Sequence, residues 1–213
     1  MKTDELIALM AAETAPTTGG VVRRRLLAAC LIGATATAGL LFLVKGPWQG
    51  LVPALGAGAF WMKAAYTLWL AAGGFWLADR AARPGARAGL APVVVGAALV
   101  SMGALAGLNL AALPVEHWRA AWMGVSARVC PVFIIGAAAP VYAGVVLALR
   151  SLAPTRLALA GAAAGLLAGA VGASVYALWC RETAPLFVAC WYTLGVAVCA
   201  GLGALLGPKV LRW

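Results

Sequence analysis

Residues 157–179 read LALAGAAAGLLAGAVGASVYALW and contain no charged side chain. A hydrocarbon core of about 30 Å needs about 20 apolar residues in a helix, so this stretch is long enough to cross a membrane. Backbone groups cannot stay unpaired in lipid, and the stretch lacks the period-two alternation of a barrel strand, so we predict a transmembrane helix. Its stripe of Gly161, Gly165 and Gly169 is typical of close packing against a neighbouring helix.

The sequence on both sides of this stretch is also strongly apolar. Hydrophobic residues make up 64% of the 213 and charged residues 10%, with a mean hydropathy of +0.97, whereas soluble domains carry roughly 25% charge. Six apolar runs approach the length of a span, at about 26–44, 58–78, 89–110, 130–149, 157–179 and 186–206. The sequence predicts an all-α membrane protein, with a bundle of six transmembrane helices over residues 26–213 and a short N-terminal segment, residues 1–25.

The basic residues set the orientation of this predicted bundle. Most of them lie on one side: Lys2, Arg23, Arg24, Arg25, Arg80, Arg83, Arg87, Arg150, Arg156, Lys209 and Arg212. The opposite side holds fewer, namely Lys45, Lys63, Arg119, Arg128 and Arg181, together with a belt of aromatic rings. Positive residues concentrate on the cytoplasmic face, so both termini are expected in the cytoplasm. The net charge of +10 then reflects topology and contact with an anionic lipid bilayer, and not direct binding of nucleic acid.

The N-terminal segment has the pattern of a short amphipathic helix. Thr3 can cap a helix whose first turn carries Asp4 and Glu5. An apolar face follows, made of Leu6, Ile7, Leu9 and Met10. A helix of about ten residues is marginal alone in water, so it should dock on the bundle, on the membrane surface or on a partner. Its acidic first turn is unlike that of lipid-seeking helices, which favours a groove on a cytoplasmic protein.

Few signals for transport or catalysis are present. No Asp, Glu, Arg or His falls at mid-membrane depth, where transporters and channels usually need polar groups. Lys63 lies about one turn inside the outer interface, and we expect it to snorkel to water. The chain has no HExxH, GxSxG, phosphate loop, CxxC or paired carboxylates, so we do not expect an enzyme. His117, the single histidine, falls in the outer loop 113–128 and is expected at the surface.

Two of the five cysteines, Cys130 and Cys180, fall at the same outer rim of the predicted bundle. Arg128 and Arg181 lie beside them in sequence, and nearby positive charge favours the thiolate. Three outcomes are open: a constitutive disulfide, a redox switch, or a transient heavy-metal site completed by Glu182 or His117. No resident cofactor is expected. The remaining cysteines, Cys30, Cys190 and Cys199, are expected to behave as small buried hydrophobes.

A resemblance to a known family rests on an ordered set of short motifs. They are Met1-Lys2-Thr3-Asp4-Glu5-Leu6-Ile7, Arg23-Arg24-Arg25, Arg128-Val129-Cys130-Pro131, Leu152-Ala153-Pro154-Thr155-Arg156, Cys180-Arg181-Glu182-Thr183, Phe187, Trp191-Tyr192-Thr193, Leu206-Gly207-Pro208 and Leu211-Arg212-Trp213. With these motifs, the chain resembles the NrsF family of bacterial anti-sigma factors over essentially its whole length. The resemblance implies a six-span inner-membrane protein that holds an extracytoplasmic-function sigma factor and releases it on an inducing signal.

The same resemblance assigns roles to particular residues. Cys130 and Cys180 match the family's outward-facing cysteine pair, which is tied to sensing metal or oxidative stress. The short N-terminal segment takes the place of the larger sigma-binding domain of other anti-sigma factors. We therefore expect Asp4, Glu5 and the apolar residues that follow them to engage the sigma factor, although no residue is predicted to relay the signal.

Two other functions are weighed against this one. A membrane thiol-disulfide oxidoreductase would use the outer cysteine pair, but it would also need a quinone or partner-dithiol site. A small transporter would need polar groups at mid-depth. The sequence supplies neither feature.

Overall fold

A computed structural model describes residues 19–47, 55–83, 85–152 and 154–212. The predicted docking helix with Asp4, Glu5, Leu6, Ile7, Leu9 and Met10 lies outside these residues. Within the described ranges the regular structure is entirely helical and contains no strand, as the sequence predicts.

The helices follow the predicted apolar runs closely. They are α2 (Gly19–Lys45), α4 (Gly58–Ala81), α5 (Ala91–Ala112), α6 (Val115–Met123), α7 (Cys130–Arg150), α8 (Leu157–Tyr176), α9 (Pro185–Phe187) and α10 (Thr193–Val210). A π-helical turn, Val188–Tyr192, joins α9 to α10, so these elements together fill the sixth predicted run. The short helix α6 was not predicted, and it occupies the segment that the sequence suggested as a loop.

Five segments of the described chain are long and apolar enough to cross a membrane. They are Gly20–Lys45, Ala91–Ala112, Cys130–Arg150, Leu157–Tyr176 and Pro185–Val210. Helix α4 has the length of a span but is less apolar, because it carries Lys63, Asp79 and several aromatic and glycine residues. The predicted count of six spans is therefore matched by six helical runs but by five candidate spans.

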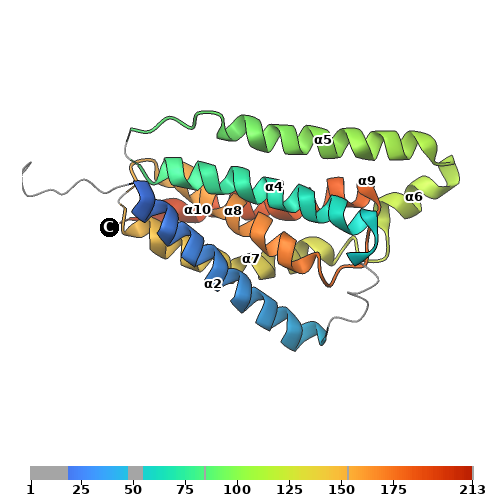
Figure 1. The fold of residues 1–213 in the computed structure, drawn as a ribbon, viewed down its shortest axis with the longest axis horizontal. Helices are drawn as coiled ribbons and strands as arrows, with labels where there is room; N and C mark the ends of the chain where they lie inside the picture. The colour runs from blue at the N-terminus through green and yellow to red at the C-terminus, as the bar shows by residue number, and fades with distance from the viewer. Residues whose placement is uncertain (1–18, 48–54, 84, 153, 213) are drawn as a thin grey trace, which may run out of the picture.

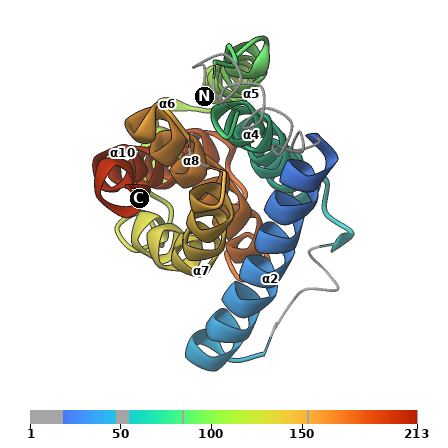
Figure 2. The ribbon, with the colours of Figure 1, turned by 90° about the vertical axis from the view of Figure 1, so that its left-hand side faces the viewer.

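Helix α8 lies at the centre of the bundle and packs against α4, α7 and α10, while α2 packs on α7 and α5 on α4 (Figure 1). In the end-on view, α2 and α5 lie at opposite edges of the molecule (Figure 2). The predicted glycine stripe explains the close approach of α8 to α10. A Cβ atom on Gly161 would collide with the carbonyl oxygen of Gly203, and one on Gly165 would collide with that of Cys199.

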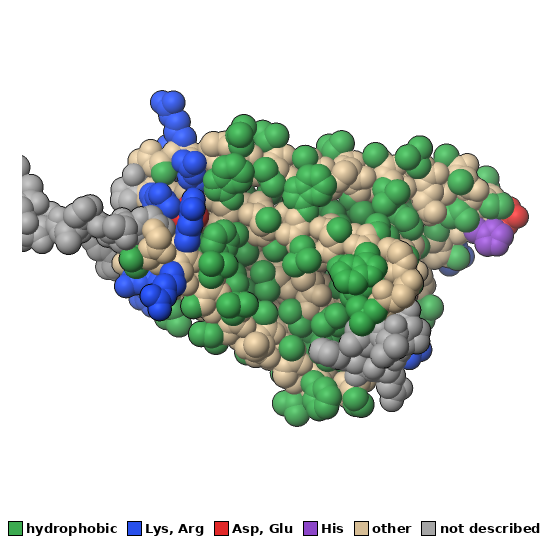
Figure 3. Space-filling model, viewed as in Figure 1, with side chains coloured by type: hydrophobic (Ala, Val, Ile, Leu, Met, Phe, Trp, Pro, Cys, Tyr) green, Lys and Arg blue, Asp and Glu red, His purple; other side chains and the backbone are tan. Residues whose placement is uncertain are grey.

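The side chains on the outside of the bundle are largely apolar, with Leu31, Ile32, Val100 and Leu205 among the exposed ones. Exposed apolar surface on this scale is unusual for a soluble monomer but is what a lipid-facing surface requires. Lys and Arg side chains gather at one end, called here the basic end, beyond the apolar flank (Figure 3). The opposite end, called the thiol end, carries the single histidine, His117, at its tip (Figure 3).

Candidate functional site

Cys130 and Cys180 meet at the thiol end. Cys130 is the first residue of α7, and Cys180 lies in the loop after α8. Helical turns position both residues, since the Cys130 N–H donates to Ser126 O at 2.8 Å and the Cys180 N–H donates to Tyr176 O at 3.1 Å. Both are free thiols, with side chains only 0% and 8% exposed, and they hydrogen-bond to each other. The structure thus brings together the two cysteines that sequence reasoning paired.

Lys63 of α4 is a charged group beside this pair. Its Nζ donates to Cys180 O at 2.6 Å and to Glu182 O at 3.0 Å, and the residue is 1% exposed. The expectation that Lys63 snorkels to water is therefore wrong. The carbonyls of the loop after α8 have no helical partner, so the ammonium group supplies their donor and gains two acceptors in the buried site.

Glu182 ties the two loops of the thiol end together. Its Oε1 accepts from Val125 N at 2.7 Å and from Ser126 N and Ser126 Oγ at 3.1 Å each. Gly124 precedes these donors with a φ of 48°, and a Cβ there would lie 2.5 Å from a carboxylate oxygen of Glu182. The glycine is needed both for the left-handed backbone and for the space that the carboxylate fills.

The suggested ligands for a metal are not gathered around the thiols. In the described part of the chain, no group of three or more His, Cys, Asp or Glu residues could hold a metal ion. Glu182 already accepts hydrogen bonds from the loop before α7, and His117 is exposed on α6 (Figure 3). Cys130 and Cys180 alone would supply two sulfur ligands.

Aromatic side chains enclose the inner side of the thiol pair. The rings of Tyr176 and Tyr192 lie 6.1 Å apart, and that of Phe133 lies 5.6 Å from Tyr176. Lys45, at the end of α2, places its Nζ 3.9 Å from the centre of the Phe133 ring. The buried Tyr192 hydroxyl has no conventional hydrogen-bond partner among the described residues and lies beside the Cys180 sulfur. Sequence reasoning placed Tyr192 in the aromatic belt of the outer interface and gave no role to Phe133 or Tyr176, so it missed the place of these rings around the thiols.

The electrostatics of the site favour one thiolate. The hydrogen bond from the Cys130 thiol, and then the Lys63 ammonium, hold the pKa of Cys180 below its ordinary value of 9.0, although burial acts in the opposite direction. Sequence reasoning assigned this effect to Arg128 and Arg181, but both are exposed. The signal that was missed is a lysine inside a helical run, a position where a charge needs a partner.

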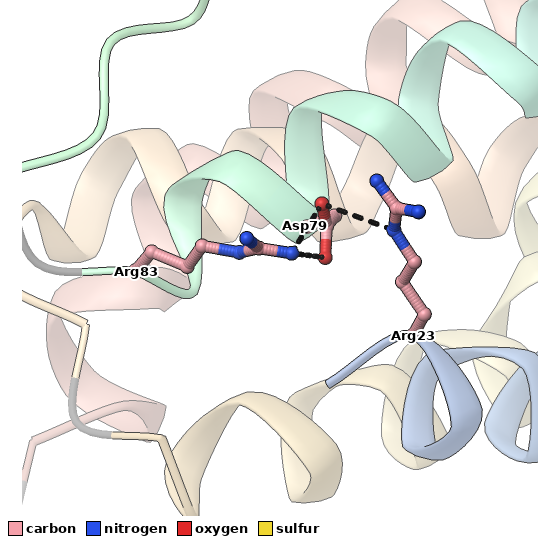
Figure 4. Close-up of polar contacts among 3 residues, drawn as sticks. All are labelled: Arg23, Asp79 and Arg83. Carbon is pink, nitrogen blue, oxygen red and sulfur yellow. Dashed lines mark hydrogen bonds and ion pairs between the residues drawn. The ribbon is translucent and has the colours of Figure 1, made fainter. Parts of the chain in front are cut away.

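At the basic end, α4 carries a second buried charged group, Asp79, whose side chain is 3% exposed. Arg83 Nη2 donates to its two carboxylate oxygens at 2.8 and 3.0 Å, and Arg23 Nε of α2 lies 3.7 Å from Oδ2 (Figure 4). Asp79 thereby links α4 to the start of α2. Lys63 and Asp79 lie about 24 Å apart along one helix, so α4 connects the thiol pair with the basic end.

Comparisons with known proteins find relatives that match the whole length of the chain. Residues 10–213 match the family described as NrsF, negative regulator of sigma F. A protein of Azospira oryzae named "Probable anti-sigma-F factor NrsF" is 37% identical over 100% of both chains. The "Anti-sigma-F factor NrsF" of Caulobacter vibrioides is 36% identical, again over 100% of both chains. No solved structure matches.

Proposed function

Because the chain belongs to the NrsF family of negative regulators of sigma F, we propose that it is a membrane anti-sigma factor and not an enzyme. The observation that carries the proposal is the match over the full length of two relatives named as anti-sigma-F factors. In this role the protein holds a sigma factor of the extracytoplasmic-function class at the bacterial inner membrane, away from RNA polymerase.

The topology proposed for this role has six spans, with α4 as the sixth. The two buried charges of α4, Lys63 and Asp79, lie toward opposite ends of the helix, and each is bonded to neighbouring segments. Such satisfied charges are compatible with a helix surrounded by other helices. The basic end then faces the cytoplasm, in keeping with the concentration of arginines there.

The proposed docking segment precedes α2 in the sequence. Helix α2 begins at Gly19 and its Arg23 lies at the basic end, so in the proposed topology the segment would belong to the cytoplasmic side. Their apolar positions, Leu6, Ile7, Leu9 and Met10, would engage the sigma factor, with Asp4 and Glu5 beside them. The sigma factor would be held within a short length of chain from the start of α2.

The thiol pair is the proposed sensor. Oxidation by a peroxide would begin with attack of the Cys180 thiolate, which forms a sulfenic acid and releases water or an alcohol. The Cys130 thiol would then displace the oxygen as water and close a disulfide, so that the pair loses two electrons and the peroxide gains them. A thiophilic metal ion could instead bind both sulfurs, with loss of their protons.

Helix α4 is the proposed route to the cytoplasmic face. A disulfide removes the thiolate charge beside Lys63, whereas a bound metal cation neutralises it, and Lys63 is bonded to the carbonyl of Cys180 itself. A shift of α4 would reach Asp79 and, through it, Arg23 at the start of α2. To change sigma-factor occupancy from 1:99 to 99:1, the signal must supply about 5.5 kcal/mol.

The anti-sigma proposal is tested by co-purification of the cognate sigma factor with the full-length protein from membranes. The variant Leu6→Asp/Met10→Asp changes the proposed apolar face, and Ala8→Asp/Ala12→Asp adds the same charge to the opposite face as the matched control. We expect capture to fall strongly in the first variant and to persist in the second. Equal capture by both variants would exclude this docking face, and failure of the unaltered protein to capture any sigma factor would exclude the anti-sigma role.

The sensor proposal is tested separately, in cells that report sigma-factor activity. Cys130→Ser and Cys180→Ser, singly and together, are compared with Cys190→Ser, which alters a cysteine outside the pair. We expect the first set to keep the sigma factor bound but to lose induction by peroxide or Cd²⁺, whereas the control responds normally. A normal response in the double variant would remove the sensor role and leave the anti-sigma role intact.

A further inference from the structure

A cavity of about 620 Å³ opens at the basic end between α4 and α8, under the connection from α4 to α5. Its rim and its depth differ in chemistry. The rim carries four arginines, namely Arg80, Arg83, Arg87 and Arg156, and the hydroxyl-bearing Thr155. The part of the lining that lies farther from the basic end, called here the deeper wall, is apolar and includes Leu77, Leu159, Ala163, Leu166 and Ala200.

The positive charge of the rim is suited to binding an anion. No acidic side chain is among the described residues that line the cavity, and Asp79 nearby is already bonded to Arg83 and Arg23. Arg83 lines the cavity as well and uses its Nη2 to hold Asp79. The planar guanidinium forks of several arginines match the oxygens of a phosphate.

The long apolar wall of the cavity favours an anion that also carries an apolar chain. On α8, the lining runs from Arg156 to Leu166, about 15 Å along the helix axis. A free phosphate or a stretch of nucleic acid would leave this apolar wall uncovered, whereas an acyl chain would fill it. Basic pockets between helices on the cytoplasmic side of membranes are suited to anionic lipid headgroups.

We propose that this cavity binds one anionic phospholipid, with the phosphate among the four arginines and an acyl chain along the apolar wall of α4 and α8. The phosphate would accept hydrogen bonds from guanidinium groups of the cavity lining, which include that of Arg83, and Arg83 also holds Asp79 through its Nη2. The lipid would thereby brace the Asp79 link between α4 and α2. This binding site does not depend on the anti-sigma role.

Native mass spectrometry of the purified full-length protein tests the proposal, by titration with phosphatidylglycerol and, in parallel, with phosphatidylcholine. The pocket variant is Arg80→Gln/Arg87→Gln/Arg156→Gln, which spares Arg83 because it holds Asp79. The matched control, Arg24→Gln/Arg150→Gln/Arg212→Gln, removes the same charge from the same end outside the cavity. Ala162→Phe, on the cavity wall, narrows the acyl path without changing the charge.

We expect one tightly held phosphatidylglycerol, with its apparent affinity about a hundredfold weaker in the pocket variant and about tenfold weaker or less in the control. Ala162→Phe should also weaken lipid binding, and inorganic phosphate should not displace the lipid.

Equal loss of affinity in both arginine variants would show an effect of surface charge alone and overturn the site. Displacement by inorganic phosphate would identify a free anion site instead. Loss of sigma-factor capture by the pocket variant in phosphatidylcholine membranes would identify a protein groove instead.

Discussion

Lys63 is buried, and its ammonium group lies where loop carbonyls and a thiol pair come together. Its two hydrogen bonds fix the backbone of the loop that carries Cys180. Its charge favours the thiolate that would react first. The same side chain therefore serves both the geometry and the reactivity of the pair.

Replacement of Lys63 by Met should raise the pKa of Cys180 toward its ordinary value, because the cation is removed while burial remains. In the unaltered protein the low pKa of Cys180 keeps the thiolate present at neutral pH. In the variant the pKa is higher, so less thiolate is present at pH 7 and reactivity is lost there. We expect alkylation by iodoacetamide at pH 7 to slow by about tenfold, with the midpoint of the rate–pH profile shifted upward.

Arg181→Met is the control for this prediction, since it removes a positive charge from the exposed residue next to Cys180. Lys63→Arg should recover part of the rate, because the positive charge is kept. If Arg181→Met shifted the profile as far as Lys63→Met, the special role of the buried ammonium would be refuted. Peptide mapping of the alkylated protein identifies which of the two sulfurs reacts.

At the scale of helices, the contact between α8 and α10 depends on glycines that leave no room for a side chain. Gly161→Ala would push a methyl group into the carbonyl of Gly203, and the backbones would have to separate. We expect a loss of about 1–3 kcal/mol in unfolding free energy, measured by denaturation of the detergent-solubilised protein. Gly103→Ala on α5 is the control, as nothing lies within 4 Å of the added Cβ. Equal stability of the two variants would contradict the close packing.

The sequence predicted these helices well because uninterrupted apolar length is a strong signal. It predicted the meeting of Cys130 and Cys180 from the alternation of spans alone. The amphipathic α6 was missed because nine residues between two spans look like a loop. The hydrogen-bond partners of Lys63 were missed because they are backbone carbonyls of a loop that is distant in the sequence. The sequence does not indicate which backbone carbonyls lack a hydrogen-bond donor.

The link between α2 and α4 at the basic end was missed for a related reason. Asp79 directly follows the apolar run expected at about 58–78, and nothing local in the sequence indicates that its side chain is only 3% exposed. Its burial depends on helices that pack against α4, which is a tertiary effect. The family, by contrast, was predicted from an ordered set of motifs, and the family match confirms it.

At the scale of the whole molecule, α4 carries a buried charged residue toward each end, Lys63 at the thiol end and Asp79 at the basic end. Arg23→Gln should break the ion pair with Asp79 while leaving the thiol end unchanged. We expect normal alkylation of Cys130 and Cys180 but weaker release of the sigma factor after oxidation. Both quantities can be measured on the same membrane preparation.

Arg24→Gln is the matched control, because it removes the neighbouring charge from an exposed position. Full release in Arg23→Gln would show that the signal takes another route. A change in thiol reactivity would show that the substitution disturbs the bundle as a whole and does not act on the link alone.

The enclosure of the two sulfurs also decides which chemicals can act on them. A disulfide-exchange enzyme must bring its own cysteine into bonding contact, and the side chains that cover Cys130 and Cys180 stand in its way. A peroxide molecule or a metal ion is small enough to enter through brief openings of the loops. Burial would thus select reactants by size. Small toxic agents in the surroundings would react with the pair, whereas the cell's own thiol-oxidising enzymes would not.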